Sequence, residues 1–149
     1  MGGFLEEVAR RARGAGVFKG VKVESSRVIC DALASAEPAA YRVDVDEGGS
    51  VSVSLVTSNR WLSESIEAEL MHTGDKIEEL LEEELIDQGY EGKLTCQHYR
   101  SDDLLFTFRS ELPVKPDSKG AAGAAKCLLA YEACFRELGD MEADEEEGP

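Results

Sequence analysis

Strict alternation of apolar and polar residues is the clearest structural signal in the chain. Tyr41, Val43 and Val45 alternate with polar residues, and from 51 to 55 valine and leucine alternate with serine. Because successive side chains of a strand point to opposite faces, both stretches are typical of strands with one buried face. We therefore predict a β-hairpin whose apolar side is buried and whose polar side faces water.

The turn of this hairpin falls at two adjacent glycines. A three-residue loop over 47–49 pairs Val45 with Val51. The same register pairs Val43 with Val53, and it places every apolar residue of both strands on one side. A shift of one residue would turn the apolar side chains of one strand outward, so we expect this register.

The stretch KLTCQHYRSDDLLFTFRSEL predicts a second hairpin. A three-residue loop over 101–103 pairs His98 with Phe106. The same register pairs Cys96 with Phe108, two positions further along each strand. The core face of this hairpin then consists of Leu94, Cys96, Phe106 and Phe108.

The N-terminal part of the chain predicts a helix followed by a strand. Phe4, Val8 and Ala12 share one face of a short helix. Gly14 can end that helix, since glycine is a common residue at helix C-termini. The apolar residues of 21–23 then suggest a strand.

The segment 27–35 fits two structures. Val28, Cys30 and Ala32 alternate with other positions, and this spacing favours a strand. The composition of the same residues also fits a helix, and that alternative stays open.

The segment 59–87 carries apolar residues at the spacing of one helical face. Its stripe consists of Leu62, Ile66, Leu70, Ile77, Leu81 and Leu85. Asn59 can cap the helix, and Gly74 can break or kink it. The alternation of apolar residues within 60–71 also fits a strand, and this second interpretation stays open.

The acidic stretch 75–87 forms the second half of this predicted helix. Like-charged pairs four residues apart, such as Glu78 with Glu82, are each unfavourable by about 0.2–0.5 kcal/mol. Burying one leucine contributes about 1.5–3 kcal/mol, which outweighs that repulsion. We therefore expect the helix to lie on a core, with its carboxylates in solvent and Gly89 at its C-terminal end.

A further amphipathic helix is predicted over 124–138, after a loop over 113–123. Its buried face consists of Ala124, Cys127, Leu128, Tyr131, Cys134, Phe135 and Leu138. Residues 139–149 are acidic and nearly devoid of apolar side chains, so we predict a disordered tail.

These elements predict an α+β fold in a single domain over residues 1–138. The expected order is α-βββ-α-ββ-α, with about five antiparallel strands and with helices packed on one face of the sheet. We expect the central and C-terminal helices to cover that face. The predicted core comprises Val43, Val53, Leu62, Ile66, Ile77, Leu81, Leu85, Phe106, Phe108, Tyr131 and Phe135.

The net charge of the chain limits the classes of partner that it can bind. With 31 acidic against 16 basic residues, a formal charge of −15 argues against nucleic acid or an anionic membrane as a partner of the whole molecule. No stretch approaches the roughly 20 apolar residues of a membrane span. Residues 1–28 are instead basic, and we expect them to lie near the acidic helix of the same chain or of a second copy.

The N-terminal segment lacks the apolar region of a secretory signal. The cysteines are spaced unlike the pairs of a zinc ribbon, and they occur at Cys30, Cys96, Cys127 and Cys134. We therefore expect reduced thiols and a cytoplasmic location.

Cys96 and His98 are the strongest candidates for chemistry. Two positions apart on a strand, they could bind a metal ion, with Cys127 or Cys134 of the last helix as a third ligand. They could also form a nucleophilic pair. The favoured interpretation is that Cys96 packs opposite Phe108 as a small apolar residue. No other group of residues forms an enzyme site, so we predict a non-enzymatic protein without a cofactor.

The order of the elements, the small acidic chain and the terminal amphipathic helix resemble the type III secretion chaperone-like fold, including the YbjN-type bacterial proteins. The resemblance covers roughly residues 3–138. It implies a non-enzymatic domain that binds a protein or peptide partner and often forms a homodimer. We therefore expect a protein-binding, chaperone-like or regulatory module, with the Cys96 and His98 metal-binding domain as the alternative.

Overall fold

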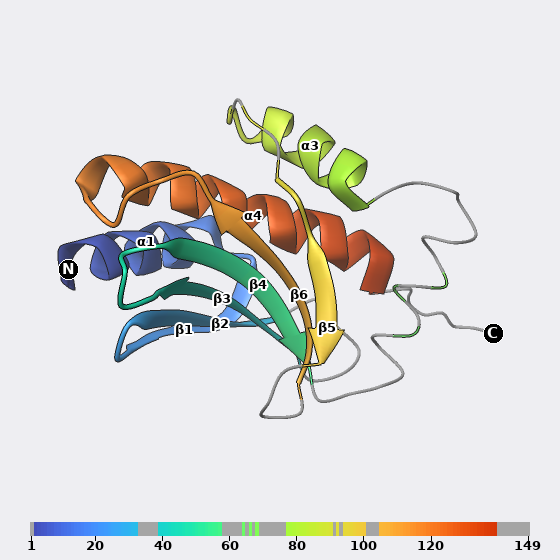
Figure 1. Cartoon of the computed structure of the whole chain (residues 1–149), viewed down its shortest axis with the longest axis horizontal. Helices are drawn as coiled ribbons and strands as arrows, with labels where there is room; N and C mark the ends of the chain where they lie inside the picture. Colours follow the sequence, from blue (N-terminus) through green and yellow to red (C-terminus); the bar gives the residue numbers. More distant parts are fainter. Residues whose placement is uncertain are drawn as a thin grey trace.

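The computed structural model describes residues 2–32, 39–57, 64, 66, 68, 77–90, 92, 94–100 and 105–139. In these parts of the chain, two helices cover one side of a six-stranded antiparallel sheet, and a third helix packs on one of them (Figure 1). The predicted α+β fold class is therefore confirmed.

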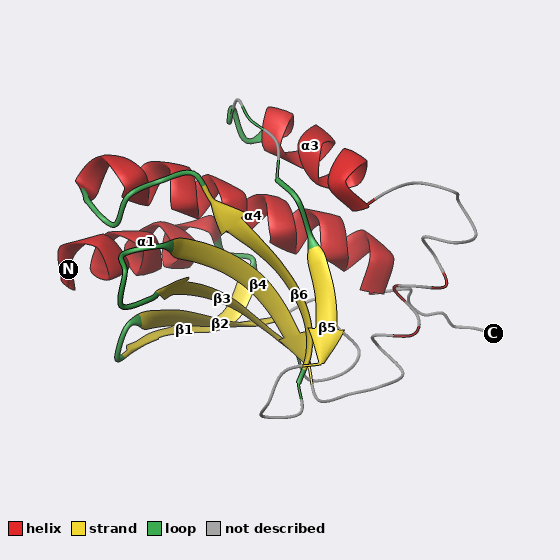
Figure 2. Cartoon of the chain, viewed as in Figure 1, coloured by secondary structure: helices red, strands yellow, loops and turns green. Residues whose placement is uncertain are grey.

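The helices are α1 (Gly2–Ala15), α3 (Ile77–Asp87) and α4 (Ser118–Gly139). The strands are β1 (Phe18–Glu24), β2 (Arg27–Ala32), β3 (Ala40–Val45), β4 (Val51–Thr57), β5 (Gln97–Arg100) and β6 (Phe106–Leu112). Their order in the sheet is β1-β2-β3-β4-β6-β5, and all neighbours are antiparallel (Figure 2). Four strands rather than three precede the central helix. The stretches around 21–23 and 27–32 each form a strand, β1 and β2, and both belong to the sheet.

The first hairpin has the predicted register. Val45 pairs with Val51, and Val43 pairs with Val53. Gly49 has a φ of 86°, in the left-handed region that glycine adopts without strain. The two glycines therefore close the three-residue loop as the sequence predicts.

The segment from Arg27 to Ala32 is a strand, and not the helix that its composition also allows. Val28 and Cys30 are fully buried on its core face. The remaining part of the predicted strand, 33–35, lies outside the described residues. Between 58 and 76, the described positions Glu64, Ile66 and Ala68 are helical, as the helix interpretation of 60–71 requires.

The predicted register of the second hairpin is wrong by two residues. His98 pairs with Phe108, and Arg100 pairs with Phe106, so five residues rather than three connect the strands. The shift lets the His98 ring stack flat on the Phe108 ring, with centroids 3.9 Å apart. Since the shift is an even number of residues, each side chain keeps its predicted face, although Cys96 now precedes the strand.

The helices that cover the sheet differ from those predicted. α1 and α4 pack against each other and against the strands, whereas α3 packs against α4 (Figure 1). The C-terminal part of the predicted central helix, α3, therefore packs on α4 rather than on the sheet, and α1 covers the sheet beside α4. Leu81 and Leu85 of α3 are fully buried, as predicted.

The end of α3 is fixed by a backbone motif. Gly89 has a φ of 77°, and its N–H donates to the carbonyl of Ile86. The N–H of Tyr90 donates to the carbonyl of Leu85, which completes a Schellman motif. The predicted role of Gly89 is confirmed.

The last helix begins at Ser118, six residues before the predicted start at 124. Asp117 caps it, since its Oδ1 accepts the backbone N–H of Gly120 at 2.8 Å. A Cβ at Gly120 would lie 1.8 Å from the carbonyl oxygen of Lys115, so only glycine fits this close approach of two backbone segments. The glycines that suggested a loop therefore serve packing inside a helix.

Most of the predicted core is buried. The buried members are Val43, Val53, Ile66, Leu81, Leu85, Phe108, Tyr131 and Phe135. Ile77 and Phe106 are only partly buried, and Leu62 lies outside the described residues. The predicted tail also lies outside them from residue 140 onward.

Candidate functional site on the uncovered sheet face

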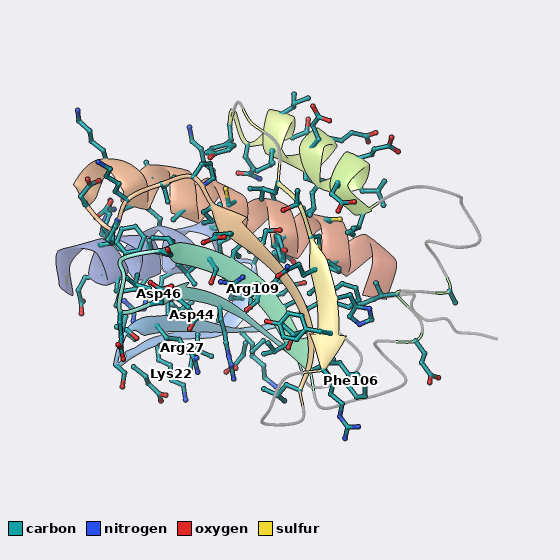
Figure 3. The ribbon with its side chains drawn as sticks, in the orientation of Figure 1. Lys22, Arg27, Asp44, Asp46, Phe106 and Arg109 are labelled. Atoms are coloured by element: carbon teal, nitrogen blue, oxygen red, sulfur yellow. The ribbon has the colours of Figure 1, made fainter. Side chains whose placement is uncertain are left out.

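The sheet face that points away from α1 and α4 carries polar residues in rows that cross several strands. In one row, Arg42 of β3 pairs with Ser54 of β4, which pairs with Arg109 of β6. A second row contains Arg27, Asp44, Ser52 and Glu111, and a third contains Ala40, Val56, Thr107 and Tyr99. Figure 3 shows charged members of these rows over neighbouring strands of the sheet.

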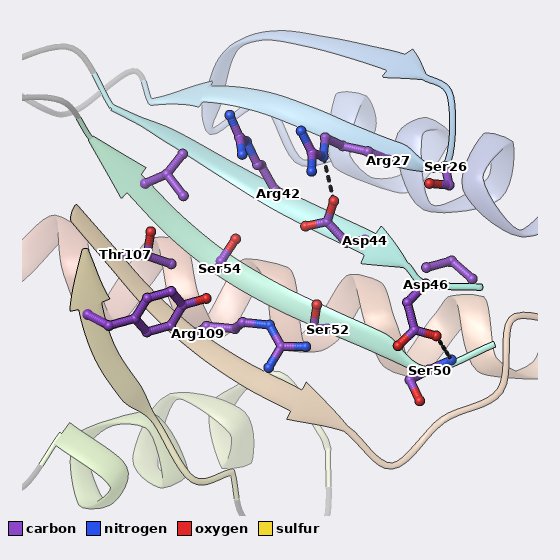
Figure 4. Close-up of a pocket in the computed structure, with 13 residues that line it drawn as sticks. Ser26, Arg27, Arg42, Asp44, Asp46, Ser50, Ser52, Ser54, Thr107 and Arg109 are labelled. Carbon is purple, nitrogen blue, oxygen red and sulfur yellow. Dashed lines mark hydrogen bonds and ion pairs between the residues drawn. The ribbon is translucent and has the colours of Figure 1, made fainter. Parts of the chain in front are cut away.

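These rows line an open pocket of about 390 Å³ on this face, which we call the uncovered face because no described helix lies on it (Figure 4). A volume of this size falls within the range of small-ligand and side-chain pockets. Its lining consists of Ser26, Arg27, Arg42, Asp44, Val45, Asp46, Ser50, Ser52, Ser54, Val56, Tyr99, Thr107 and Arg109. Charged and hydroxyl groups therefore dominate it, with Val56 and Tyr99 as the main apolar contribution.

The floor of the pocket is buried although no described helix covers this face. Ser52, Ser54 and Thr107 are each 4% exposed. Their burial corrects the prediction that the polar side of the first hairpin faces water. The physical reason is the register, because longer side chains such as Arg42 and Arg109 stand on both sides of the small β4 residues.

The two aspartates of the pocket, Asp44 and Asp46, both bind other groups of the chain. Arg27 forms an ion pair with Asp44 across the neighbouring strands. Asp46 accepts the backbone N–H groups of Gly48 and Ser50 at 2.9 and 2.8 Å, and so it holds the hairpin turn. Both carboxylates therefore have structural partners.

Arg109 differs from these charged groups. Within the described part of the chain, its guanidinium makes no hydrogen bond or ion pair. The same holds, among the described residues, for the hydroxyls of Ser52 and Ser54. The middle of the pocket therefore offers a guanidinium and the hydroxyls of two serines, all of which can donate to a ligand.

The structure does not bring the predicted metal ligands together. The Cys96 thiol lies 3.7 Å from the hydroxyl of Tyr131, which in turn lies 2.6 Å from the hydroxyl of Ser110. His98 is exposed and stacks on Phe108. Among the described residues, no group of three or more histidine, cysteine, aspartate or glutamate side chains could hold a metal ion.

Burial holds the thiols of Cys96 and Cys127 in their protonated form. Desolvation raises the pKa of Cys96 to about 11 and that of Cys127 to about 12. Cys134 is buried on the same helix. Raised thiol pKa values disfavour the thiolate that a nucleophile or a metal ligand requires.

One carboxylate of the acidic helix is not solvated as predicted. Glu78 of α3 accepts the backbone N–H of Cys96 at 3.2 Å. The contact ties α3 to the segment that leads into β5. Glu79 and Glu83 of the same helix are exposed, as predicted.

The charge of the basic N-terminal segment suggested ion pairs with the acidic helix, whereas its described ion pairs are made with Glu7, Glu24 and Asp44. Arg10 and Arg11 instead form ion pairs with Glu7 of their own helix. Hydrogen bonds from these arginines, that of Arg10 foremost, lower the pKa of Glu7 to about 2. A contact between the basic segment of one copy and α3 of another stays a prediction.

Sequence reasoning missed the pocket residues because it assigned every polar strand position to solvent. One signal points to them, namely that an arginine stands in each predicted hairpin on the side opposite the core. The missing information was that β4 pairs with β6, which brings Arg42 and Arg109 to opposite sides of Ser54.

Comparison with known proteins finds no matching protein-family model, no matching curated protein and no matching solved structure. Among the helices of the described residues, none is long and apolar enough to span a membrane. The geometry of the uncovered face is therefore the basis for a functional proposal.

Proposed function

We propose that the chain is a non-enzymatic protein-binding module, of a chaperone-like or regulatory kind, that holds a segment of a partner polypeptide on its uncovered sheet face. The observation that carries this proposal is the polar pocket of about 390 Å³ on the side of the sheet away from α1 and α4. Its central groups have hydrogen-bonding capacity that the described residues leave unused. A ligand from outside can use that capacity.

The composition of the pocket favours a polypeptide as its ligand. Different parts offer different contacts: an ion pair at Arg27 and Asp44, hydroxyls at the centre, and an apolar end at Val56 and Tyr99. Tyr99 is 41% exposed, so an aromatic surface is ready for contact. A chain with varied side chains can match such a mixed surface.

The adjacent sheet edge supports the same proposal. β5 has four residues, all exposed, and it is the last strand on its side of the described sheet. An unpaired strand edge can accept the backbone of a bound segment. The resemblance to type III secretion chaperone-like proteins agrees with this function, and with it we propose a cytoplasmic location and a homodimer.

Site-specific photocrosslinking tests this function. Gln97 of β5 is exposed and pairs with Arg109, so it lies on the uncovered face beside the pocket. A photoreactive benzoylphenylalanine at position 97 should capture a discrete partner in the native host, and mass spectrometry should map the adduct to one segment of that partner. The matched control places the same group at Glu83, which is exposed on α3.

We expect adducts from position 97 and few or none from position 83. Adducts formed equally well from both positions, or from position 83 alone, would show that the uncovered face is not the binding surface. Absence of any adduct at position 97 would also contradict the proposal.

A further inference from the structure

We infer that Arg109, Ser52 and Ser54 form a carboxylate-binding subsite, which takes an acidic side chain of the bound segment. This inference rests on the proposed function, because it names the chemistry by which the uncovered face recognises its partner. The subsite lies at the middle of the pocket, on β4 and β6.

The geometry of the three side chains is the first argument. Ser54 pairs directly with Arg109, and Ser52 lies two residues along the same face of β4. Figure 4 shows Arg109 lying alongside β4 toward Ser52. A guanidinium and two hydroxyls thus border one space, and all of them can donate hydrogen bonds to a carboxylate.

Burial is the second argument. Both serines are 4% exposed, and Arg109 is partly buried. Within the described residues these three side chains make no hydrogen bond or ion pair. Neither serine hydroxyl is a fully buried atom without a partner, so both reach the space of the pocket, where a ligand beside Arg109 can accept their hydrogen bonds.

The charge of the pocket selects the class of anion. Three arginines and two aspartates line it, which leaves one positive charge. A carboxylate neutralises that charge. A phosphate carries up to two negative charges at neutral pH, and its second charge would face Asp44 and Asp46 without a counterion. The pocket therefore favours a carboxylate over a phosphate.

The third row, which contains Val56, Thr107 and Tyr99, adds a second requirement for the bound segment, namely an apolar side chain. Thr107 lies two residues from Arg109 on β6, and it is flanked by Val56 and Tyr99. Two residues of a strand span about 7 Å. An extended segment places side chains two positions apart at that same separation and on one side. An acidic residue with an apolar residue two positions away would therefore reach Arg109 and Tyr99 together.

Titration with short peptides tests the subsite. The probe is the acetylated and amidated tripeptide Glu-Ala-Leu, added up to about 10 mM to the full-length protein at low salt and followed by NMR. We expect saturating shifts at the amides of 52–56 and 107–109 and at the Arg109 Nε–H signal. The tripeptide Gln-Ala-Leu should bind at least tenfold more weakly, because it lacks the charge that Arg109 recognises.

Variants assign the binding to the named side chains. Arg109→Gln should abolish the shifts, and the double variant Ser52→Ala with Ser54→Ala should weaken binding severalfold while it keeps the preference for Glu. The matched control is Arg10→Gln, which removes an exposed guanidinium of α1 and should leave binding unchanged. Far-ultraviolet circular dichroism checks that each variant is folded.

Three results would overturn the inference. They are equal affinity for the Glu and Gln peptides, unchanged binding by a folded Arg109→Gln variant, and no shift at all up to the highest concentration. A phosphoserine-Ala-Leu peptide that binds tenfold more tightly than Glu-Ala-Leu would assign the subsite to phosphate instead. If crosslinking from position 97 succeeds while the peptides show no discrimination, the proposed function stands and only the subsite is wrong.

Discussion

At the scale of single residues, glycine at position 120 lets the first turn of α4 approach the backbone at Lys115. A side chain there would collide with the carbonyl oxygen of Lys115, because the two backbones approach each other directly. Sequence reasoning placed this glycine in a loop, since glycine usually disfavours helices. The close approach is a tertiary property, which no local pattern contains.

We expect Gly120→Ala to lower the free energy of unfolding by about 1–3 kcal/mol, because the added Cβ forces two backbone segments apart. Urea denaturation followed by circular dichroism measures the change. Gly14→Ala is the matched control, since Gly14 lies in α1 with nothing within 4 Å of the added Cβ. It should be neutral or stabilising by up to about 1 kcal/mol. An equal effect of both substitutions would show that helix propensity, and not the contact with Lys115, governs position 120.

The burial of the β4 serines is a second feature of single residues that the sequence pattern does not predict. Ser52 and Ser54 alternate with apolar residues just as solvated serines do, and yet they are buried. Their burial depends on the longer side chains that flank them from β3 and β6, which are Arg42 and Arg109 beside Ser54 and Asp44 and Glu111 beside Ser52. The candidate site was therefore unpredictable from the alternation, even though the strands that carry it were predicted.

At the scale of elements, the sequence predicted those features that depend on contacts between residues close together in the chain. The first hairpin had the right register, because the two glycines and the alternation agree on one loop. The second hairpin lacks glycine between its strands, so no turn residue specifies one loop, and in the observed register His98 stacks on Phe108. The role of α1 as a cover of the sheet also escaped prediction, since packing partners are not encoded in the period of a helix.

The acidic helix α3 allows a sharp test of burial against exposure. Leu81 is fully buried in the core, whereas Ile86 of the same helix is 65% exposed. We expect Leu81→Asp to lower the free energy of unfolding by about 4 kcal/mol or more, because it removes apolar packing and buries a charge. Ile86→Asp should change it by less than about 1 kcal/mol. Thermal melting of both variants checks the difference, and similar melting temperatures would contradict the described packing of α3 on α4.

At the scale of the whole molecule, the sheet ends in strand edges at β1 and β5 within the described part of the chain. Such edges tend to be covered by association, so the homodimer stays a specific prediction. Sedimentation velocity at two micromolar concentrations tenfold apart should show the mass shift of a dimer. A monomer mass at both concentrations would refute it.

The ionic strength of the same experiment separates two kinds of association. Contact between the basic segment of one copy and α3 of another should weaken in high salt, because salt screens exposed charges. Strand pairing at a sheet edge should be much less sensitive. Association that persists in high salt would therefore favour the edges.

The pairing of β4 with β6 has a consequence for how the chain folds. β1 to β4 are neighbours in both sequence and space, whereas Thr57 of β4 pairs with Phe106 of β6, far along the chain. Closing so long a segment carries a large entropic cost before its contacts form, and such non-local pairings slow folding. The four-stranded meander can form early, and docking of β6 onto β4 then becomes the slow step. The pocket, whose floor is shared by these two strands, would come into existence only at that last stage.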